Sequence, residues 1–373
     1  MNTLRNVFRN LGEKQRVIGC FPLYPPMELL DSMGFTPLIM WGFKHQFTNT
    51  HQSDKHVQDY VCSIARYLTE FTLSDYANIL KGILFYNACD SLRNLPEILT
   101  YNLNKKNGIV PYFHFHLPMN SMEKSYMHEY LIDEIKVLIR DLEYKFPLKF
   151  NFENFQQSVR EYRKFRKLSK KLERKIVEYG LSYKEYVKAM HDSNYLTLEE
   201  KVELFDSTIK RITEKSALKK KPNGNKVILS GIFPPPLKII DLIEKSGFHI
   251  VGNDIASLRR SIYYTPPENS YQNVGEYYVE FYQNHFPCPT LLYTSDRRIP
   301  KILELIDITD ADGVIFIGEK FCEYEYFEFP TLSNTLDENG KKTLELEFSA
   351  EETYNIEAYK TRIEAFYELI SNI

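Results

Sequence analysis

The sequence predicts an α/β protein in which two similar lobes, each built on a parallel sheet, are joined by a helical segment. Residues 17–41 and 227–254 read alike, which is the first reason for this prediction. Each is a short apolar run, a proline pair or triplet, an amphipathic helix, a glycine and a second apolar run. Residues 82–96 and 313–330 extend the match, because each passes from a glycine through an apolar strand to a cysteine and an acidic residue.

The residues between these copies give a third observation, because their pattern changes from strands to long helices. A chain of 373 residues is also too long for one ordinary core, which favours two or three domains. We expect a first α/β lobe over 1–120, a helical connecting segment over 121–225 and a second α/β lobe over 226–373.

Each strand–helix–strand unit has a physical cause in its sequence. The runs Val17–Phe21 and Val227–Phe233 are short and apolar, as parallel strands covered on both faces must be. Pro25–Pro26 and Pro234–Pro236 suit a first helical turn, where a missing N–H costs nothing. One buried helix stripe and a helix-ending glycine follow in each unit, and the second helix is predicted about one turn longer. These residues are Met27, Leu30, Met33 and Gly34, then Leu237, Ile240, Ile243 and Gly247.

Further strands complete the two sheets. The first lobe is expected to add strands near Leu38–Trp41 and Ile109–Phe115, and the second to add Leu291–Thr294 and Leu344–Phe348. A final helix over Ile356–Ile370 is expected to pack back on the second sheet. Crossovers between parallel strands are almost always right-handed, so both lobes should be Rossmann-like or flavodoxin-like.

Composition excludes several classes of protein. The hydrophobic fraction of 43% and the charged fraction of 26% are those of a globular protein. A net charge of −3 argues against a general nucleic-acid binder, which carries a basic excess. No run approaches the roughly 18 apolar residues of a membrane helix, and the N-terminus lacks the apolar core of a secretion signal. Five cysteines over this length are no disulfide framework, so we expect a cytoplasmic protein with neither nucleic-acid nor membrane partners.

The cysteines carry the main functional hypothesis. Cys89 and Cys322 occupy equivalent places in the two lobes, just past a strand, where open parallel sheets bind ligands. Cys62 lies in a helical pattern one element before Cys89, and the lack of a CxxC spacing excludes a zinc ribbon or ferredoxin loop. A lone cysteine at a strand end is more often a small core residue, but the equivalent placement favours ligands in a cleft between the lobes.

Other polar residues have weaker patterns. Glu28 opens a helix next to the cleft and is a candidate to bind substrate or orient a water, with a favourable first-turn charge as the alternative. His114 and His116 alternate along a strand, so they point to one face and could ligate metal, although two half-buried histidines are commoner. Cys20 and Cys288 are interpreted as structural, with either able to approach the same cleft.

Basic residues near the cleft also have two interpretations. Arg93 and Arg297 follow cleft-facing segments and could pair with a phosphate or carboxylate, or could form ordinary salt bridges. Arg163–Lys175 holds eight basic residues in thirteen, which predicts a solvated helix face. The phosphates of a ligand, or an acidic partner, are the alternative for this run.

Four short motifs stand in order along the chain. They are Tyr24-Pro25-Pro26-Met27-Glu28-Leu29, Cys89-Asp90-Ser91-Leu92-Arg93, Asp312-Gly313-Val314-Ile315 leading to Phe321-Cys322, and Thr361-Arg362-Ile363-Glu364-Ala365-Phe366. Together they resemble the subunit family of 2-hydroxyacyl-CoA dehydratases and benzoyl-CoA reductases, which includes the D-component of 2-hydroxyglutaryl-CoA dehydratase. The likeness covers nearly the whole chain.

The resemblance implies a [4Fe–4S] cluster held by three cysteines, which map onto Cys62, Cys89 and Cys322. It implies a heterodimer with a homologous second subunit, and an ATP-hydrolysing iron–sulfur activator that supplies one electron. In such enzymes a ketyl radical forms on an (R)-2-hydroxyacyl-CoA and expels the hydroxyl group to give an enoyl-CoA. The redox chemistry belongs to the cluster, and the protein contributes positioning and electronics.

Three departures from the family pattern bear on the subunit's role. Glu357-Ala358 replace the usual Gly-Gln, Tyr324 follows Glu323 where aspartate and proline are commoner, and Leu346–Phe348 lacks a frequent aspartate. These departures favour an electron-relaying partner subunit over the catalytic one. A benzoyl-CoA-reductase-type or double-cubane reductase component, and a two-lobed binding protein without a cluster, are the alternatives.

Overall fold

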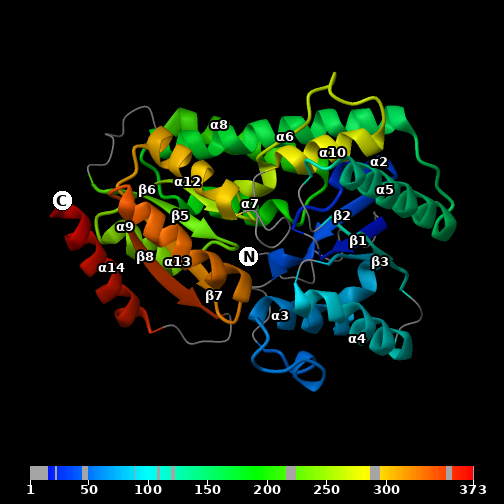
Figure 1. The fold of residues 1–373 in the computed structure, drawn as a ribbon, viewed down its shortest axis with the longest axis horizontal. Helices are drawn as coiled ribbons and strands as arrows, with labels where there is room; N and C mark the ends of the chain where they lie inside the picture. Colours follow the sequence, from blue (N-terminus) through cyan, green and yellow to red (C-terminus); the bar gives the residue numbers. More distant parts are fainter. Residues whose placement is uncertain are drawn as a thin grey trace.

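The computed structural model describes residues 16–21, 23–43, 49–87, 89–106, 110–118, 122–215, 224–285, 295–349 and 355–372. Two four-stranded sheets, one from each end of the chain, lie side by side, and long helices run along both of them (Figure 1). The predicted α/β class with two parallel-sheet lobes is confirmed.

The first sheet has the strand order β2-β1-β3-β4, and all its pairs are parallel. Its strands are β1 (Arg16–Cys20), β2 (Phe35–Ile39), β3 (Leu80–Phe85) and β4 (Tyr112–His114). Strand β2 was predicted near Leu38–Trp41 but starts three residues earlier, at Phe35. It ends at Ile39, because Met40–Phe43 form a 3-10 turn. Strand β2 pairs on one side of β1, and the chain then crosses to add β3 and β4 on the other side, which is the doubly wound, flavodoxin-like arrangement.

The second sheet repeats this order as β6-β5-β7-β8, again entirely parallel. Its strands are β5 (Lys226–Gly231), β6 (His249–Ile255), β7 (Gly313–Glu319) and β8 (Lys342–Phe348). All seven residues of β7 are buried, as expected for a central strand covered on both faces. The strand predicted at 291–294 lies outside the described residues.

The repeated strand–helix units differ by one turn of helix, as predicted. Helix α2 (Met27–Ser32) has six residues and α9 (Leu237–Lys245) has nine. Gly34 and Gly247 follow these helices with φ values of 79° and 98°, the left-handed conformation that a helix-ending glycine adopts readily. The prolines come one position earlier than predicted, since Pro26 and Pro236 are the residues that cap the two helices.

Each half of the chain adds further helices around its sheet. The first lobe contains the 3-10 turns η2 (Ser53–Lys55) and η3 (Asp75–Ile79) and the helices α3 (Ser63–Leu73) and α4 (Asp90–Lys106). The second contains η4 (Arg260–Ile262), α10 (Val274–Asn284), α12 (Ser295–Thr309), α13 (Glu323–Glu338) and α14 (Ile356–Ser371). Helix α14 packs on α9 and β8, as predicted for the end of the chain.

The connection between the lobes is helical, with α5 (Ser125–Lys145), α6 (Phe152–Glu178), α7 (Lys184–Ser193) and α8 (Leu198–Lys215). Helix α6 has 27 residues and is therefore about 40 Å long. In Figure 1 it extends over both lobes, with α8 packed beside it. It contacts α2 of the first lobe and β6 of the second. The expected boundaries of the three domains stay a prediction.

Helix α10 ties the lobes together. It follows the second lobe's β6 in the chain, yet it packs against α5 and lies beside α2 in Figure 1. Its residues Tyr277, Tyr278 and Tyr282 are buried in the hydrophobic core of the first lobe, together with Phe233 of the β5–α9 loop. The core of the first lobe therefore includes residues from the second half of the chain, which joins the two lobes.

Candidate metal centre

Each of the three predicted cysteine ligands stands directly before a helix. Cys62 and Cys322 are the capping residues of α3 and α13, and Cys89 precedes the first residue of α4. Cys89 and Cys322 also follow the central strands β3 and β7 of their sheets. Cys62 was expected inside a helix, but the helix begins one residue later, at Ser63.

The helix starts direct backbone N–H groups at the three sulfur atoms. Such donors favour the thiolate over the thiol, and a helix N-terminus adds a partial positive charge. The amides that hydrogen-bond the sulfur atoms and lower the pKa values belong to Ile64 and Ala65 for Cys62, Ser91 and Leu92 for Cys89, and Glu325 for Cys322.

The three thiols lie close enough to influence one another. Burial, together with negative charge on Cys89 and Glu319, raises the pKa of Cys62 to about 12. The pKa of Cys322 is raised by burial, then by Glu325, Cys62 and Cys89. Burial also raises the pKa of Cys89. A cation or cluster that binds these thiols must therefore displace their protons, as thiolate ligation requires.

This set of donors fits an iron–sulfur cluster. Thiolates are the soft ligands that such clusters use, and three of them leave one iron of a four-iron cluster without a protein ligand. Within the described ranges, no group of three or more His, Cys, Asp or Glu side chains is arranged to hold a metal ion.

Two buried carboxylates of the second lobe adjoin the cysteines. Glu319 ends β7, and the Ser63 hydroxyl of the first lobe donates a hydrogen bond to it. Glu325, in the first turn of α13, accepts from the backbone N–H groups of Glu319 at 2.8 Å and Ile232 at 2.7 Å. Burial raises the pKa of Glu325 to about 7, and the Glu319 charge adds to this effect.

The turn that presents Cys322 is strained. Phe321, the residue before it, has a φ of 64°, a left-handed conformation that is unfavourable for a side chain of this size. Its ring is half exposed, so hydrophobic burial of that ring does not account for the strain. The Cys322 N–H donates to the Glu319 carbonyl at 2.9 Å, which holds the turn closed.

Glu28 lies in a polar network of its own. It is fully buried, pairs with Arg166 at 2.5 Å and accepts hydrogen bonds from the hydroxyls of Tyr277 at 2.9 Å and Tyr278 at 3.3 Å. Because these partners come from α6 and α10, the carboxylate ties three helices of the shared core together. Its predicted catalytic role stays a prediction, and the contacts it makes are structural ones between helices.

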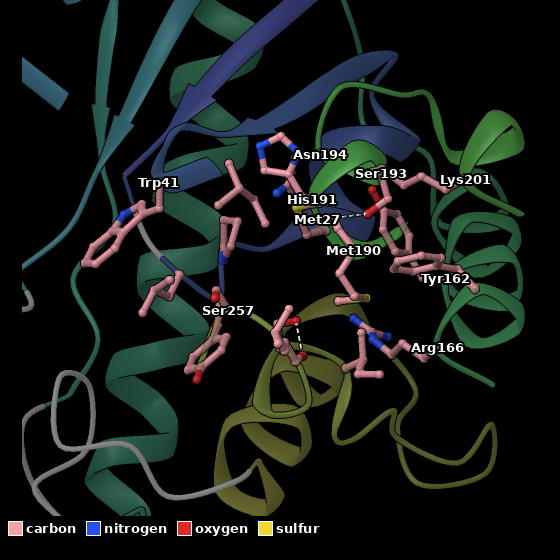
Figure 2. Close-up of a pocket in the computed structure, with 18 of the residues that line it drawn as sticks. Met27, Trp41, Tyr162, Arg166, Met190, His191, Ser193, Asn194, Lys201 and Ser257 are labelled. Carbon is pink, nitrogen blue, oxygen red and sulfur yellow. Dashed lines mark hydrogen bonds between the residues drawn. The ribbon is translucent and has the colours of Figure 1, made fainter. Parts of the chain in front are cut away.

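A cavity opens behind this network, where the loops after β1, β2, β5 and β6 meet helices α6 to α8. Figure 2 shows Trp41 on one side of it and Tyr162, Arg166 and Lys201 on the other. Its volume is about 100 Å³, smaller than the roughly 300 Å³ at which sites for drug-sized ligands begin. The described residues that line it do not include the three cysteines.

The histidine pair and Arg93 make contacts that favour structural roles over ligand binding. The rings of His114 and His116 stack with centroids 5.6 Å apart, and the backbone N–H of His116 donates to Glu134 at 3.0 Å. Burial lowers the pKa of His114, and the neighbouring His116 lowers it further. Arg93 forms an exposed pair with Asp90 at 3.4 Å.

Arg297 and the basic run on α6 are also largely explained by local contacts. Arg297 is exposed and donates to the Gln283 carbonyl at 3.4 Å. Within the run, Arg166 is buried and pairs with Glu28, whereas the predicted solvated face is the exposed part of the run. That part consists of Lys164, Lys167, Lys170, Lys171 and Arg174.

The two cysteines interpreted as structural have different outcomes. Cys20 ends β1, is fully buried and donates its thiol proton to the Ile18 carbonyl at 3.6 Å. Burial raises its pKa far above the usual value, which suits an unreactive core thiol. Cys288 lies outside the described residues.

The sequence reasoning missed a buried ion network in the second lobe. Arg298, next to the predicted Arg297, pairs with Asp254 at 2.8 Å and also with Glu328. Arg260 completes the network through Asp254 at 3.3 Å. The helical period contained a signal for it, because Arg298 shares the buried stripe of α12 with Ile302, Leu305 and Ile306.

Comparison with known proteins identifies the family. The family model for 2-hydroxyglutaryl-CoA dehydratase, D-component, matches residues 22–370. The chain belongs to this family. The family is that of 2-hydroxyacyl-CoA dehydratase subunits, which are enzymes of the lyase class, and this chain is matched by a benzoyl-CoA reductase subunit as well. The resemblance inferred from the four motifs is confirmed.

Relatives of this family match nearly end to end. The (R)-phenyllactyl-CoA dehydratase beta subunit of Clostridium sporogenes is 27% identical over 362 residues, 95% of this chain and 92% of the relative. The lactoyl-CoA dehydratase subunit beta of Anaerotignum propionicum is 23% identical over 95% of this chain and 91% of its own. A benzoyl-CoA reductase subunit of Thauera aromatica is 26% identical over 90% and 86%. Among the helices of the described part, none has the length and apolar content to cross a bilayer.

Proposed function

We propose that this chain is the cluster-holding, electron-relaying subunit of an (R)-2-hydroxyacyl-CoA dehydratase, with a [4Fe–4S] cluster bound by Cys62, Cys89 and Cys322. The observation that supports it is that three partly buried thiols, from two lobes and at the starts of three helices, lie close enough to raise one another's pKa. When bound, the cluster supplies one-electron transfer, which the thiol ligands alone do not provide.

The residues of the chain would bind, orient and shield that group. Their thiolates would hold three irons, with the backbone amides of α3, α4 and α13 donating to the sulfur atoms. All three cysteines pack against the core of the first lobe, which limits access of water. Glu319 and Glu325 place carboxylates beside the sulfurs, and negative charge there favours the oxidised cluster and lowers its reduction potential.

The assembly follows from the same proposal. Two relatives are named beta subunits, which supports a homologous second subunit in a heterodimer that binds the acyl-CoA. An ATP-dependent iron–sulfur activator would deliver the electron. The reaction would take place in the reducing cytosol, where free thiols persist. A benzoyl-CoA-reductase-type component is the second candidate, because one subunit of such an enzyme matches over most of its length.

The test is iron and sulfide analysis of the chain purified and reconstituted without oxygen. We expect about four irons and four sulfides per chain, with the broad visible absorption of a cluster. Cys62→Ala, Cys89→Ala and Cys322→Ala should each lose most of the iron and the absorption. Cys20→Ala is the matched control, because its thiol is equally free but buried elsewhere, and it should keep both. An iron-free wild type that is well folded would contradict the proposal.

A second assay separates the two candidate reactions. With the partner subunit and a reduced activator, a dehydratase converts an (R)-2-hydroxyacyl-CoA to an enoyl-CoA. A reductase component instead supports reduction of an aromatic acyl-CoA. We expect the first product, and its absence alongside reduction of benzoyl-CoA would assign the second candidate function.

A further inference from the structure

A side-chain hydrogen bond crosses between the lobes beside the cysteines. The Ser63 hydroxyl, next to Cys62 at the start of α3, donates to the Glu319 carboxylate at the end of β7. Both side chains are buried, each residue being 3% exposed. A bond from a hydroxyl to an ionised acceptor is about twice as strong as one between neutral groups, and burial shields it from water.

Glu319 is itself held in place from its own lobe. The backbone N–H of Glu319 donates to Oε2 of Glu325 at 2.8 Å, and Oε1 of Glu325 accepts from the Ile232 N–H at 2.7 Å. The carbonyl of Glu319 accepts from the Cys322 N–H at 2.9 Å. Glu319 therefore connects the Cys322 turn, the β5–α9 loop and, through Ser63, the helix that begins after Cys62.

We propose that Ser63 and Glu319 form a clasp between the lobes, which sets the Cys62 thiol in register with the Cys322 thiol. This inference rests on the proposed function. Three ligands that come from two lobes hold a cluster firmly only if the separation of the lobes is fixed at the site itself. The Trp41–Phe233 stack also joins the lobes, but it lines the cavity behind the site. The clasp differs from it because its two residues adjoin two different ligands.

The corresponding stretch of the first lobe makes a contact within that lobe instead. Asn87, just before Cys89, accepts from the Leu117 N–H at 3.1 Å and donates to the Leu117 carbonyl at 3.2 Å. The second lobe thus supplies the acceptor of the clasp and the first supplies the hydroxyl. The clasp orients ligands and does not touch substrate, so Ser63 and Glu319 are positioning residues.

The experiment measures how fast the reconstituted full-length chain loses iron to an iron(II) chelator under anaerobic conditions. Ser63→Ala should release iron faster, on the order of tenfold, the factor expected when one buried hydrogen bond to a charged group is lost. Ser63→Thr keeps the hydroxyl and should release iron at nearly the wild-type rate. Ser158→Ala is the matched control, because its hydroxyl also donates to a carboxylate, that of Asp31, but adjoins none of the three cysteines, and it should behave like wild type.

Glu319→Gln tests the acceptor side and covers the case in which Ser63→Ala does not fold. Its amide oxygen can still accept from Ser63, but the negative charge is lost, so the midpoint potential of the cluster should become more positive. Glu319→Gln should also release iron faster than wild type, because a hydrogen bond to a neutral acceptor is weaker than one to a carboxylate. Wild-type release rates in both Ser63→Ala and Glu319→Gln would overturn the clasp while leaving the proposed function intact, and the potential reports only the charge of Glu319. A wild-type chain that binds no cluster would overturn both.

Discussion

The two lobes have the same strand order but differ in the side chains that they bury at equivalent positions. In the pairing registers, Cys20 lies beside Ile39 in the first sheet, and Ser230 lies beside Asp254 in the second. Both pairs stand at the carboxyl ends of the first two strands of a lobe. The same pair of positions is therefore apolar in one copy and polar in the other.

The surroundings differ in the same way. Around Cys20 the first lobe packs aromatic rings, such as the edge-to-face pair of Phe21 and Phe85 with centroids 4.6 Å apart. Around Asp254 the second lobe packs buried charges, with Arg298 at 2.8 Å and Arg260 at 3.3 Å. An internal duplication thus preserves strand order and register, while the chemistry of equivalent positions changes.

The contrast suggests what apolar packing contributes to the first lobe and what the buried ion network contributes to the second. Apolar packing is tolerant of small shifts, whereas a buried ion network fixes donors and acceptors in one arrangement. Arg260 donates to the Gly231 carbonyl at 2.5 Å, so the network also holds the β5–α9 loop, whose Ile232 N–H binds Glu325. The second lobe would then hold the Cys322 turn rigidly, with the first lobe docking its two cysteines against it.

Asp254→Ala is expected to be the most damaging test of this contrast. Removing the carboxylate leaves Arg298 and Arg260 buried without their shared partner, which costs about 3–5 kcal/mol in comparable networks. Ile39→Ala is the matched change in the first lobe. It should cost less, about 1–2 kcal/mol, because Ile39 is only partly buried and leaves a small cavity.

Urea unfolding of both variants measures the two losses. A larger loss for Ile39→Ala than for Asp254→Ala would mean that the ion network contributes little and that the lobes are stabilised alike. Iron retention should follow the same order, since the network supports the loop behind Glu325.

Lys201→Met sharpens the comparison with the opposite sign. Lys201 on α8 is 6% exposed near Cys20 and Asp31, and within the described part of the chain it has no ion-pair or hydrogen-bond partner. Burial lowers its pKa from 10.5 to about 8, and this effect is only partly offset by Asp31. The ammonium lies 5.9 Å from the centroid of the Phe165 ring, a weak contact at that distance. Replacing this buried cation with a similar apolar chain should stabilise the protein by about 2–3 kcal/mol near neutral pH.

The pH dependence checks the cause. Between about pH 8 and pH 10.5 the unfolded chain binds more protons at Lys201 than the folded one, so wild-type stability should rise with pH there. The advantage of Lys201→Met should be full below about pH 8 and nearly gone by pH 10.5. Lys210→Met, on an exposed part of the same helix, is the control and should show no such trend. A destabilised Lys201→Met would show that the amine has a partner.

Much of this architecture could be predicted because short sequence patterns specify its strands and helices. A short apolar run, prolines, a spaced apolar stripe and a glycine specify a strand, a helix start, its buried face and its end, and both copies fold that way. Even the extra turn of α9 is present in its length. The equivalent placement of Cys89 and Cys322 follows from the same repeat, since each follows the third strand of its lobe.

The missed features depend on partners far apart in the chain. The sequence around Asp254 does not indicate that it pairs with Arg298, 44 residues away. Sequence patterns therefore do not distinguish Arg298 from its neighbour Arg297 as the arginine that binds a carboxylate. Glu28 was placed at the start of a helix correctly, but only the fold shows that Arg166 and two tyrosines surround it. Likewise, nothing around Ser63 in the sequence points to Glu319, 256 residues away.

The smallest expected effect is the coupling of the two lobes through Trp41 and Phe233. Their rings stack with centroids 5.4 Å apart, one from each lobe. A double-mutant cycle of Trp41→Leu and Phe233→Leu should give a coupling of about 1 kcal/mol in the free energy of unfolding, the usual value of such a ring pair. The cycle cancels the separate loss of the Trp41 hydrogen bond to the Phe21 carbonyl. A coupling near zero would mean that the lobes meet here without stabilising each other. Their relative placement would then depend on α10, on the Glu28 network and on the Ser63–Glu319 clasp.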